Sequence, residues 1–307
     1  MGAYLPSPKT DKHTIKGQNE RVSFAASEMQ GWRISMEDAQ ITEVNLGPDA
    51  MLFGVFDGHG GKEVAKFVER HFRQELLANR NYQTNRFEVA LQETYLKMDQ
   101  LLTTKEGQRE LVRLQRDLPE DYQVVVDDAD SLAGCTSVVA LIKGNKLYVA
   151  NVGDSRCVLA KAGRAIEMSQ DHKPDNQIEK DRITRAGGNV EDGRVMGNIN
   201  LSRAIGDLEY KKNAELAPEE QMVTAFPDIK VEELTPECDF IVLACDGIWD
   251  ILTCQQCVEI CYKNIAEGMD LGDVVEKVID RCLAPDVENT GGLGCDNMTM
   301  ILVKFNH

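Results

Sequence analysis

The sequence predicts an α+β sandwich, in which blocks of antiparallel strands are layered with helices. Short apolar strands follow one another closely in the middle of the chain, and such short connections favour antiparallel pairing. Two helical segments lie together before the last strand, instead of alternating with strands as they do around a parallel sheet. No repeat or low-complexity tract divides the 307 residues, so we expect one compact domain.

The first strong strand signal is the apolar run 51–56, which is too short for a helix and ends at an Asp-Gly pair. Apolar residues then recur every three or four positions from 64 to 77, which predicts a helix, and residues 87–102 repeat this pattern. The polar stretch 103–131 carries no motif, and we expect it to be partly loop. A buried strand is thus followed by two helices.

Three short strands come next, separated by two glycine-containing turns. The predicted strands are residues 137–142, 147–152 and 157–160. The turns are Gly144-Asn145 and Gly153-Asp154, which are typical hairpin signals. We therefore expect each of these strands to pair with the next.

The last part of the chain combines helices with two strands. Residues 175–186 are predicted to form a helix, with Asp175 or Asn176 as its N-cap and Gly187 at its C-terminal turn. The remaining elements are strands 240–245 and 298–305 and, between them, helices at about 254–266 and 271–283.

The charge balance argues against binding of polyanions. A net charge of -17 repels DNA, RNA and anionic membrane surfaces at long range, so nucleic acid is excluded as a partner. A phosphorylated substrate would be repelled in the same way. Any phosphate site must therefore be locally positive, through bound cations or a well-placed arginine.

The nine cysteines are too sparse for a disulfide scaffold, and reduced thiols in the cytoplasm or nucleus fit them better. Cys254, Cys257 and Cys261 fall on one face of a predicted helix, where cysteine commonly serves as a small apolar residue. No partner pair stands at metal-ligand spacing. We expect these three residues in the core.

Neither a secretory leader nor a membrane span is expected. Residues 1–20 have no apolar segment and are treated as an N-terminal extension of a domain covering 21–307, and the longest apolar run, 240–245, is far too short to cross a bilayer. Gly2 leaves N-myristoylation open, although Pro6 stands where that pattern has Ser or Thr.

Carboxylates gather at the ends of the predicted strands. Asp57 and Asp246 each follow a strong strand, Asp296 comes two residues before another, and Asp154 lies in a turn between strands. Each alone is usually a turn residue, but rigid strand ends can hold several carboxylates in fixed positions around metal ions. Oxygen ligands without paired His or Cys favour Mg²⁺ or Mn²⁺, and Gly58 would let its carbonyl approach an ion.

Three nearby groups have both an ordinary and a functional interpretation. Glu37-Asp38 is alone an exposed acidic pair or a helix-start signal, and Arg33 alone is a solvated cation. Beside a metal site, Arg33 would supply a planar fork for two phosphate oxygens. His59 is a turn histidine by default, but a histidine that titrates near neutrality could protonate a leaving alkoxide.

These residues resemble the metal-dependent type 2C protein phosphatase family from about Ser23 to the C-terminus. The ordered motifs are Met29-Gln30-Gly31-Trp32-Arg33, Met36-Glu37-Asp38-Ala39, Phe56-Asp57-Gly58-His59-Gly60-Gly61, Gly134-Cys135-Thr136, Ala150-Asn151-Val152-Gly153-Asp154-Ser155-Arg156, Ser202-Arg203-Ala204-Ile205-Gly206-Asp207, Asp246-Gly247-Ile248-Trp249-Asp250 and Cys295-Asp296-Asn297-Met298-Thr299. The resemblance implies an αββα sandwich of two antiparallel sheets flanked by helices, with two Mg²⁺ or Mn²⁺ ions at one end.

The resemblance also implies a role for each site residue. Asp57 would bridge both metals, Gly58 would offer its carbonyl to one, and Asp246 and Asp296 would bind the other. Glu37 and Asp38 would hold metal-bound waters, and Asp154 would bind a weaker third metal. Arg33 would bind the phosphate and His59 would act as the general acid. Asn297 and Thr136 would donate or accept hydrogen bonds around the metal ligands. Residues 173–207 resemble the family's flap. The plant hormone-responsive members carry a tryptophan in this flap, and this stretch has none, which argues against that subgroup.

The implied reaction is hydrolysis of phosphoserine and phosphothreonine in proteins by direct attack of a metal-bridging water, in an enzyme expected to be monomeric. No cysteine has an arginine six positions later and the Walker pattern is missing, which excludes the cysteine-phosphatase and P-loop mechanisms. Two alternatives stay open: an inactive scaffold that binds a kinase or its regulator, and a hydrolase of small phosphoesters.

Overall fold

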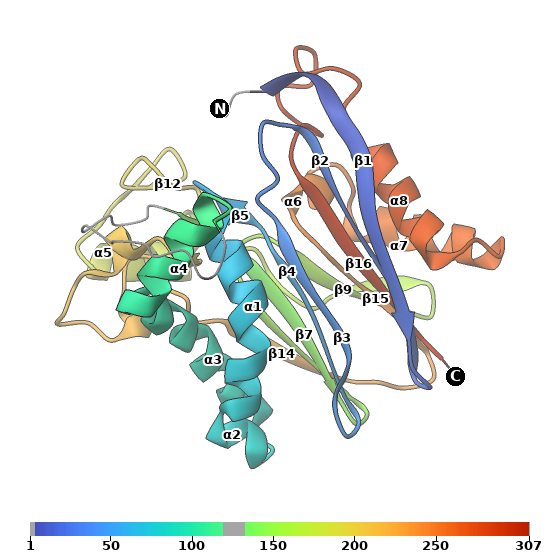
Figure 1. Ribbon diagram of the computed structural model, residues 1–307, viewed down its shortest axis with the longest axis horizontal. Coiled ribbons are helices and arrows are strands. Elements are labelled where there is room, and N and C mark those ends of the chain that lie inside the picture. Colours follow the sequence, from blue (N-terminus) through green and yellow to red (C-terminus); the bar gives the residue numbers. More distant parts are fainter. Residues whose placement is uncertain (1–3, 119–132, 307) are drawn as a thin grey trace.

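The computed structural model describes residues 4–118 and 133–306, and two antiparallel sheets stacked face to face form its centre (Figure 1). In sheet order, the first sheet contains β1 (Tyr4–Gln18), β2 (Val22–Arg33), β16 (Met298–Phe305), β15 (Cys238–Ala244), β9 (Arg156–Lys161) and β10 (Arg164–Glu167). The second contains β14 (Asp228–Glu233), β8 (Lys146–Val152), β7 (Ser137–Lys143), β4 (Ala50–Phe56) and β3 (Ala39–Gly47).

Helices cover the outer face of each sheet (Figure 1). On the second sheet lie α1 (Glu63–Ala78) and α3 (Phe87–Leu102), and α2 (Arg80–Gln83) and α4 (Lys105–Gln115) pack against these two helices. On the first sheet lie α6 (Asp246–Trp249), α7 (Cys254–Ala266) and α8 (Leu271–Cys282). This arrangement confirms the predicted sandwich of two antiparallel sheets flanked by helices.

Three apolar layers hold the sandwich together. Successive side chains of a strand point to opposite faces of its sheet, so each sheet buries apolar side chains on both faces. Between the sheets, Phe24 of β2 meets Phe53 of β4 edge to face, with ring centroids 5.7 Å apart. A second layer joins α1 and α3 to their sheet, and a third joins α7 and α8 to theirs. Cys254, Cys257 and Cys261 are buried in the third layer, which confirms the core interpretation.

Two expectations on the strands differ from the structure. Residues 4–18, expected within an N-terminal extension, form β1 and pair antiparallel with β2 at the edge of the first sheet. The expected pairing of the strand that ends at Val152 with the next strand is wrong, because β9 pairs with β15 and β10. The chain crosses from one sheet to the other at Gly153, whose φ of 102° a side-chain-bearing residue rarely adopts.

The polar stretch after residue 102 is partly helical. It contains α4, while residues 119–132 lie outside the described part of the chain. The predicted helix at 175–186 is α5 (Gln177–Arg185), and Asn176 stands before it with its side chain bonded to the Asp171 carbonyl instead of capping the helix. In residues 4–118 and 133–306, no helix has the length and apolar character needed to cross a membrane.

Residues 173–207, the stretch expected from the sequence to form a flap and called the flap below, contain α5 and the hairpin of β11 (Val190–Glu191) and β12 (Arg194–Val195). A buried carboxylate, Glu179, holds the flap together. Its oxygens lie 2.5 Å from Arg182 Nη1 and 2.6 Å from Arg203 Nη2. Burial alone would raise the pKa of Glu179, but the two guanidinium groups lower it to about 2.

We expect Glu179→Gln to loosen the flap, because both arginines would keep their charge inside the protein without a carboxylate. Breaking such a buried pair typically costs about 3–5 kcal/mol, which amide hydrogen exchange of the flap should measure. Because the folded pKa is depressed, this stabilisation is complete above the ordinary pKa of 4.5 and is lost as the pH falls toward about 2. Glu191→Gln, on the exposed hairpin, should leave exchange unchanged, and equal exchange in both variants would contradict the prediction.

Candidate active site

A cavity of about 590 Å³ opens at the end of the two sheets, next to the flap. It brings together side chains from strand ends that are far apart in the sequence. The predicted residues that line it are Arg33, Glu37, Asp57, Gly58, His59, Thr136, Asp154, Asp246, Asp296 and Asn297. Asp38 lies behind the wall, with 1% of its surface exposed. The structure therefore gathers the whole predicted set in one place.

Both sheets contribute carboxylates to this cavity. Asp57 directly follows β4 of the second sheet, and Asp38 directly precedes β3, its neighbour. On the first sheet, Asp246 follows β15 and begins α6, while Asp296 comes just before β16. Because β4, β15 and β16 are interior strands with a hydrogen-bonded neighbour on each side, they hold Asp57, Asp246 and Asp296 in fixed relative positions.

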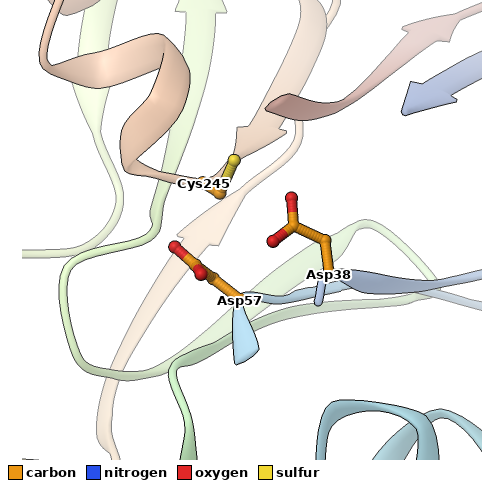
Figure 2. Close-up of side chains that lie close together, drawn as sticks. All are labelled: Asp38, Asp57 and Cys245. Carbon is orange, nitrogen blue, oxygen red and sulfur yellow. The ribbon is translucent and has the colours of Figure 1, made fainter. Parts of the chain in front are cut away.

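The tightest group consists of Asp38, Asp57 and Cys245, which point toward one another (Figure 2). One possible ligand atom from each lies within 4.8 Å of the others. Thr299 donates a hydrogen bond of 2.6 Å to Oδ2 of Asp38, whereas the buried Oδ1 of Asp38 has no partner among the described residues. A buried carboxylate oxygen without a donor is unfavourable unless a cation or a water reaches it.

The carboxylates repel one another strongly. Burial, followed by the charges of neighbouring aspartates, raises the pKa of Asp57 and of Asp246 well above the usual range. Burial is also the main reason why the pKa of Asp38 rises to about 7. Positive charge in the cavity would relieve this repulsion. Oxygen donors of this kind fit hard divalent cations such as Mg²⁺ and Mn²⁺.

The sulfur of Cys245 does not fit the role of a ligand. Burial, together with the nearby charges of Asp38 and Asp57, raises its pKa well above the ordinary value. Sulfur is also a soft donor, which suits hard cations such as Mg²⁺ and Mn²⁺ poorly. The Cys245 sulfur instead accepts a bond from the Thr299 backbone N–H at 3.2 Å. Cys245 therefore connects the end of β15 to the start of β16.

Gly58 allows the chain to pass close to Glu37. A Cβ atom on Gly58 would lie 2.4 Å from the Glu37 carbonyl oxygen, so only glycine fits. Glu37 itself is held from two sides: Ser35 Oγ donates to Oε1 at 2.7 Å, and the Gly61 N–H donates to Oε2 at 3.2 Å. Asn297 Oδ1 accepts from the Glu37 N–H at 2.9 Å, which ties this segment to the start of β16.

Two cationic side chains lie against the carboxylates. Arg33, the last residue of β2, places Nη2 2.5 Å from Asp296 Oδ2, and its guanidinium lines the cavity. Lys173, which the sequence interpretation did not single out, forms an ion pair with Asp154. The strand end that carries Asp154 is fixed by a 2.8 Å hydrogen bond between the Thr136 and Ser155 hydroxyls.

His59 has a buried carboxylate partner that the sequence interpretation also missed. Its Nε2 lies 2.7 Å from Oδ2 of Asp207. Burial opposes the charged imidazolium, but the Asp207 charge and hydrogen bond outweigh it and raise the pKa of His59. Asp207 stands within a quoted motif, yet nothing in the local sequence indicates that it faces a residue 148 positions earlier.

The fold and the cavity together define an α+β sandwich protein with an acidic candidate active site at one end of its two sheets. The family model described as "Protein phosphatase 2C" matches residues 22–291. Probable protein phosphatase 2C 5 of Paramecium tetraurelia is 50% identical over 305 residues, covering 99% of this chain and 100% of the relative. Protein phosphatase 2C 1 of the same organism is 52% identical and covers 99% of each. The chain belongs to the protein phosphatase 2C family and is a protein phosphatase.

Solved structures agree with the fold. A phosphatase from Toxoplasma gondii superposes with a TM-score of 0.75 at 23% identity, covering 96% of each chain. A serine-threonine phosphatase 2C from the same organism gives a TM-score of 0.73 at 24% identity and covers 99% of each chain. The sandwich architecture is therefore shared at low sequence identity.

Proposed function

We propose that this protein hydrolyses phosphoserine and phosphothreonine in proteins, with two Mg²⁺ or Mn²⁺ ions held by Asp57, the Gly58 carbonyl, Asp246 and Asp296. The observation that carries the proposal is the convergence of carboxylates from both sheets on a single cavity that Arg33 also lines. When bound, the cations would supply an activated water shared between them as nucleophile, and positive charge for the phosphoryl oxygens. Glu37 and Asp38 would accept hydrogen bonds from waters around the ions.

Arg33 binds the phosphate in this proposal. Its planar guanidinium at the cavity wall can donate two parallel hydrogen bonds to phosphoryl oxygens, while its ion pair with Asp296 keeps it oriented. The protein as a whole, with a net charge of -17, repels a phosphorylated substrate at long range. Arg33 supplies the local positive charge that a phosphate site in such a protein needs.

His59 protonates the leaving group. As the nucleophile's oxygen bonds to phosphorus, the bond from phosphorus to the serine or threonine oxygen breaks, and that oxygen takes a proton from the imidazolium. An alkoxide is a poor leaving group without this proton. Asp207 favours the charged imidazolium from which the proton comes.

Asp154 would hold the weaker third cation. In the structure, the Lys173 ammonium already neutralises this carboxylate, so a cation must displace it in order to bind. This competition would weaken cation binding at Asp154 relative to the other carboxylates.

The decisive assay measures phosphate release from phosphoserine and phosphothreonine peptides with Mn²⁺ or Mg²⁺, with and without EDTA, and compares it with small metabolite phosphoesters. We expect metal-dependent, EDTA-sensitive release from the peptides. Faster release from metabolites would favour a small-phosphoester hydrolase, and no release from either would favour an inactive scaffold.

Arg33→Ala should chiefly raise KM, because it removes phosphate-binding hydrogen bonds and leaves the proton donor in place. Charge-assisted hydrogen bonds are worth about 1.5–3 kcal/mol, so we expect roughly a tenfold or larger increase in KM for a phosphothreonine peptide. Arg164→Ala, on the exposed strand β10, is the matched control. An unchanged KM in Arg33→Ala would contradict the assigned role.

A further inference from the structure

Three short segments beside the cavity form a sheet of their own: β13 (Ile205–Gly206), β6 (Gly134–Cys135) and β5 (Gly58–His59). In its register, Gly206 lies opposite Gly134, and Gly134 lies opposite His59. The segment at the end of the flap is thereby fixed relative to the segment that follows β4. This small sheet determines which residue meets His59.

Asp207 is the residue that meets it. The Asp207 side chain, 3% exposed, reaches across Gly134 and places Oδ2 2.7 Å from His59 Nε2. Its backbone is left-handed, with φ 48° and ψ 40°, a conformation that Asp tolerates better than most residues. The Asp207 N–H also donates to the Ala133 carbonyl at 3.1 Å, which continues the pairing of the small sheet.

Gly134 provides the space for this pair. A Cβ atom on Gly134 would lie 2.3 Å from Asp207 Oδ2 and 2.6 Å from His59 Nε2. Gly134 is not among the glycines with positive φ, so an alanine could adopt its backbone conformation. The absence of a side chain at this position is therefore explained by the hydrogen bond above it.

A partly buried ion pair holds the same backbone from the side of α3. Asp99 of α3 accepts the Gly206 N–H on Oδ1 at 2.8 Å, and its Oδ2 pairs with Lys211 Nζ at 2.6 Å. Lys211 also donates to the Ala204 carbonyl at 2.7 Å. These bonds fix the segment on which Asp207 stands, independently of His59.

We propose that Asp207 is a positioning residue for His59, and that Gly134 is required for this contact. By holding Nε2, the Asp207 carboxylate fixes the imidazole ring so that Nδ1 is the nitrogen left to donate to the leaving oxygen. The proposal rests on the proposed phosphatase function for the proton transfer, but the orientation of His59 is a separate, measurable property.

The test compares Asp207→Ala, Asp207→Asn and Gly134→Ala with the wild type and with Asp280→Ala, a control that removes a surface ion pair with Lys12. Each is assayed with Mn²⁺ on a phosphothreonine peptide and on p-nitrophenyl phosphate, whose leaving group departs without a proton. We expect Asp207→Ala and Gly134→Ala to lower kcat on the peptide about tenfold or more, with little change in KM or in the nitrophenyl rate. Asp207→Asn keeps an acceptor for Nε2 but loses the charge, so it should restore only part of the peptide rate.

Nitrogen NMR of the imidazole in the metal-free protein gives a readout without turnover. We expect the proton of the neutral His59 ring on Nε2 in the wild type and in Asp207→Asn, and a mixture of tautomers in Asp207→Ala. Equal losses on both substrates, or an unchanged peptide rate and tautomer in Asp207→Ala, would overturn the positioning role. A wild type that releases no phosphate would overturn the proposed function, while the tautomer would still decide the role of Asp207.

Discussion

Asp57→Asn is expected to abolish metal-dependent turnover, with a loss of at least about a thousandfold in kcat. Asp57 stands at the centre of the carboxylate group, and its pKa is raised by burial and then by Asp246 and Asp38. A neutral amide there removes the charge that two cations would share. The same change relieves the repulsion between Asp57 and the neighbouring carboxylates when no metal is bound. Without metal, Asp57→Asn should therefore melt at a higher temperature than the wild type.

Calorimetric titration of Mn²⁺ and thermal melting with and without the metal measure both effects. Asp49→Asn is a matched control, because Asp49 directly precedes the strand β4 that Asp57 follows, and its φ of 51° suits asparagine equally well. We expect the control to bind Mn²⁺ and turn over like the wild type. Metal-dependent turnover that survives in Asp57→Asn would rule out the bridging role.

The parts of the site that the sequence could predict are those fixed by local pattern. Asp57 and Asp246 follow continuous apolar runs, and a buried strand that ends in a carboxylate can be recognised without knowing its neighbours. The long helices α3 and α7 were predicted with the bounds that the structure shows, because their apolar periodicity is strong. The individual roles of these site residues stay predictions.

The parts that could not be predicted depend on contacts between distant segments. The Gly153 turn looks like a hairpin, and only the packing of two sheets makes the chain cross between them there. Asp207 contacts His59, and Lys173 contacts Asp154, only because of where the flap lies in the folded protein. Strands such as β1 and β14 were missed because their alternating polar residues lie on partly exposed edges, where the hydrophobic signal is weak.

His59→Gln is expected to lower kcat on a phosphothreonine peptide by about a hundredfold, since general acid catalysis typically contributes 10²–10⁴-fold. The rate on p-nitrophenyl phosphate should fall much less, because nitrophenolate leaves without a proton. Mn²⁺ binding should persist, because His59 is bonded to Asp207 and the carboxylate group stays complete. A comparison of kcat on both substrates, with Mn²⁺ affinity measured alongside, checks all three expectations.

His71→Gln is the matched control for this substitution. His71 lies on α1 and pairs its Nε2 with Glu110 at 2.8 Å, so it loses the same kind of histidine–carboxylate contact outside the cavity. A general effect of such a loss on folding would lower both rates in both variants. If His59 donates the proton to the leaving oxygen, the loss of kcat should be larger on the peptide than on the nitrophenyl ester. This difference should occur in His59→Gln and not in His71→Gln. Equal losses on the peptide and on the nitrophenyl ester would therefore show that His59 orients the site but does not protonate the product.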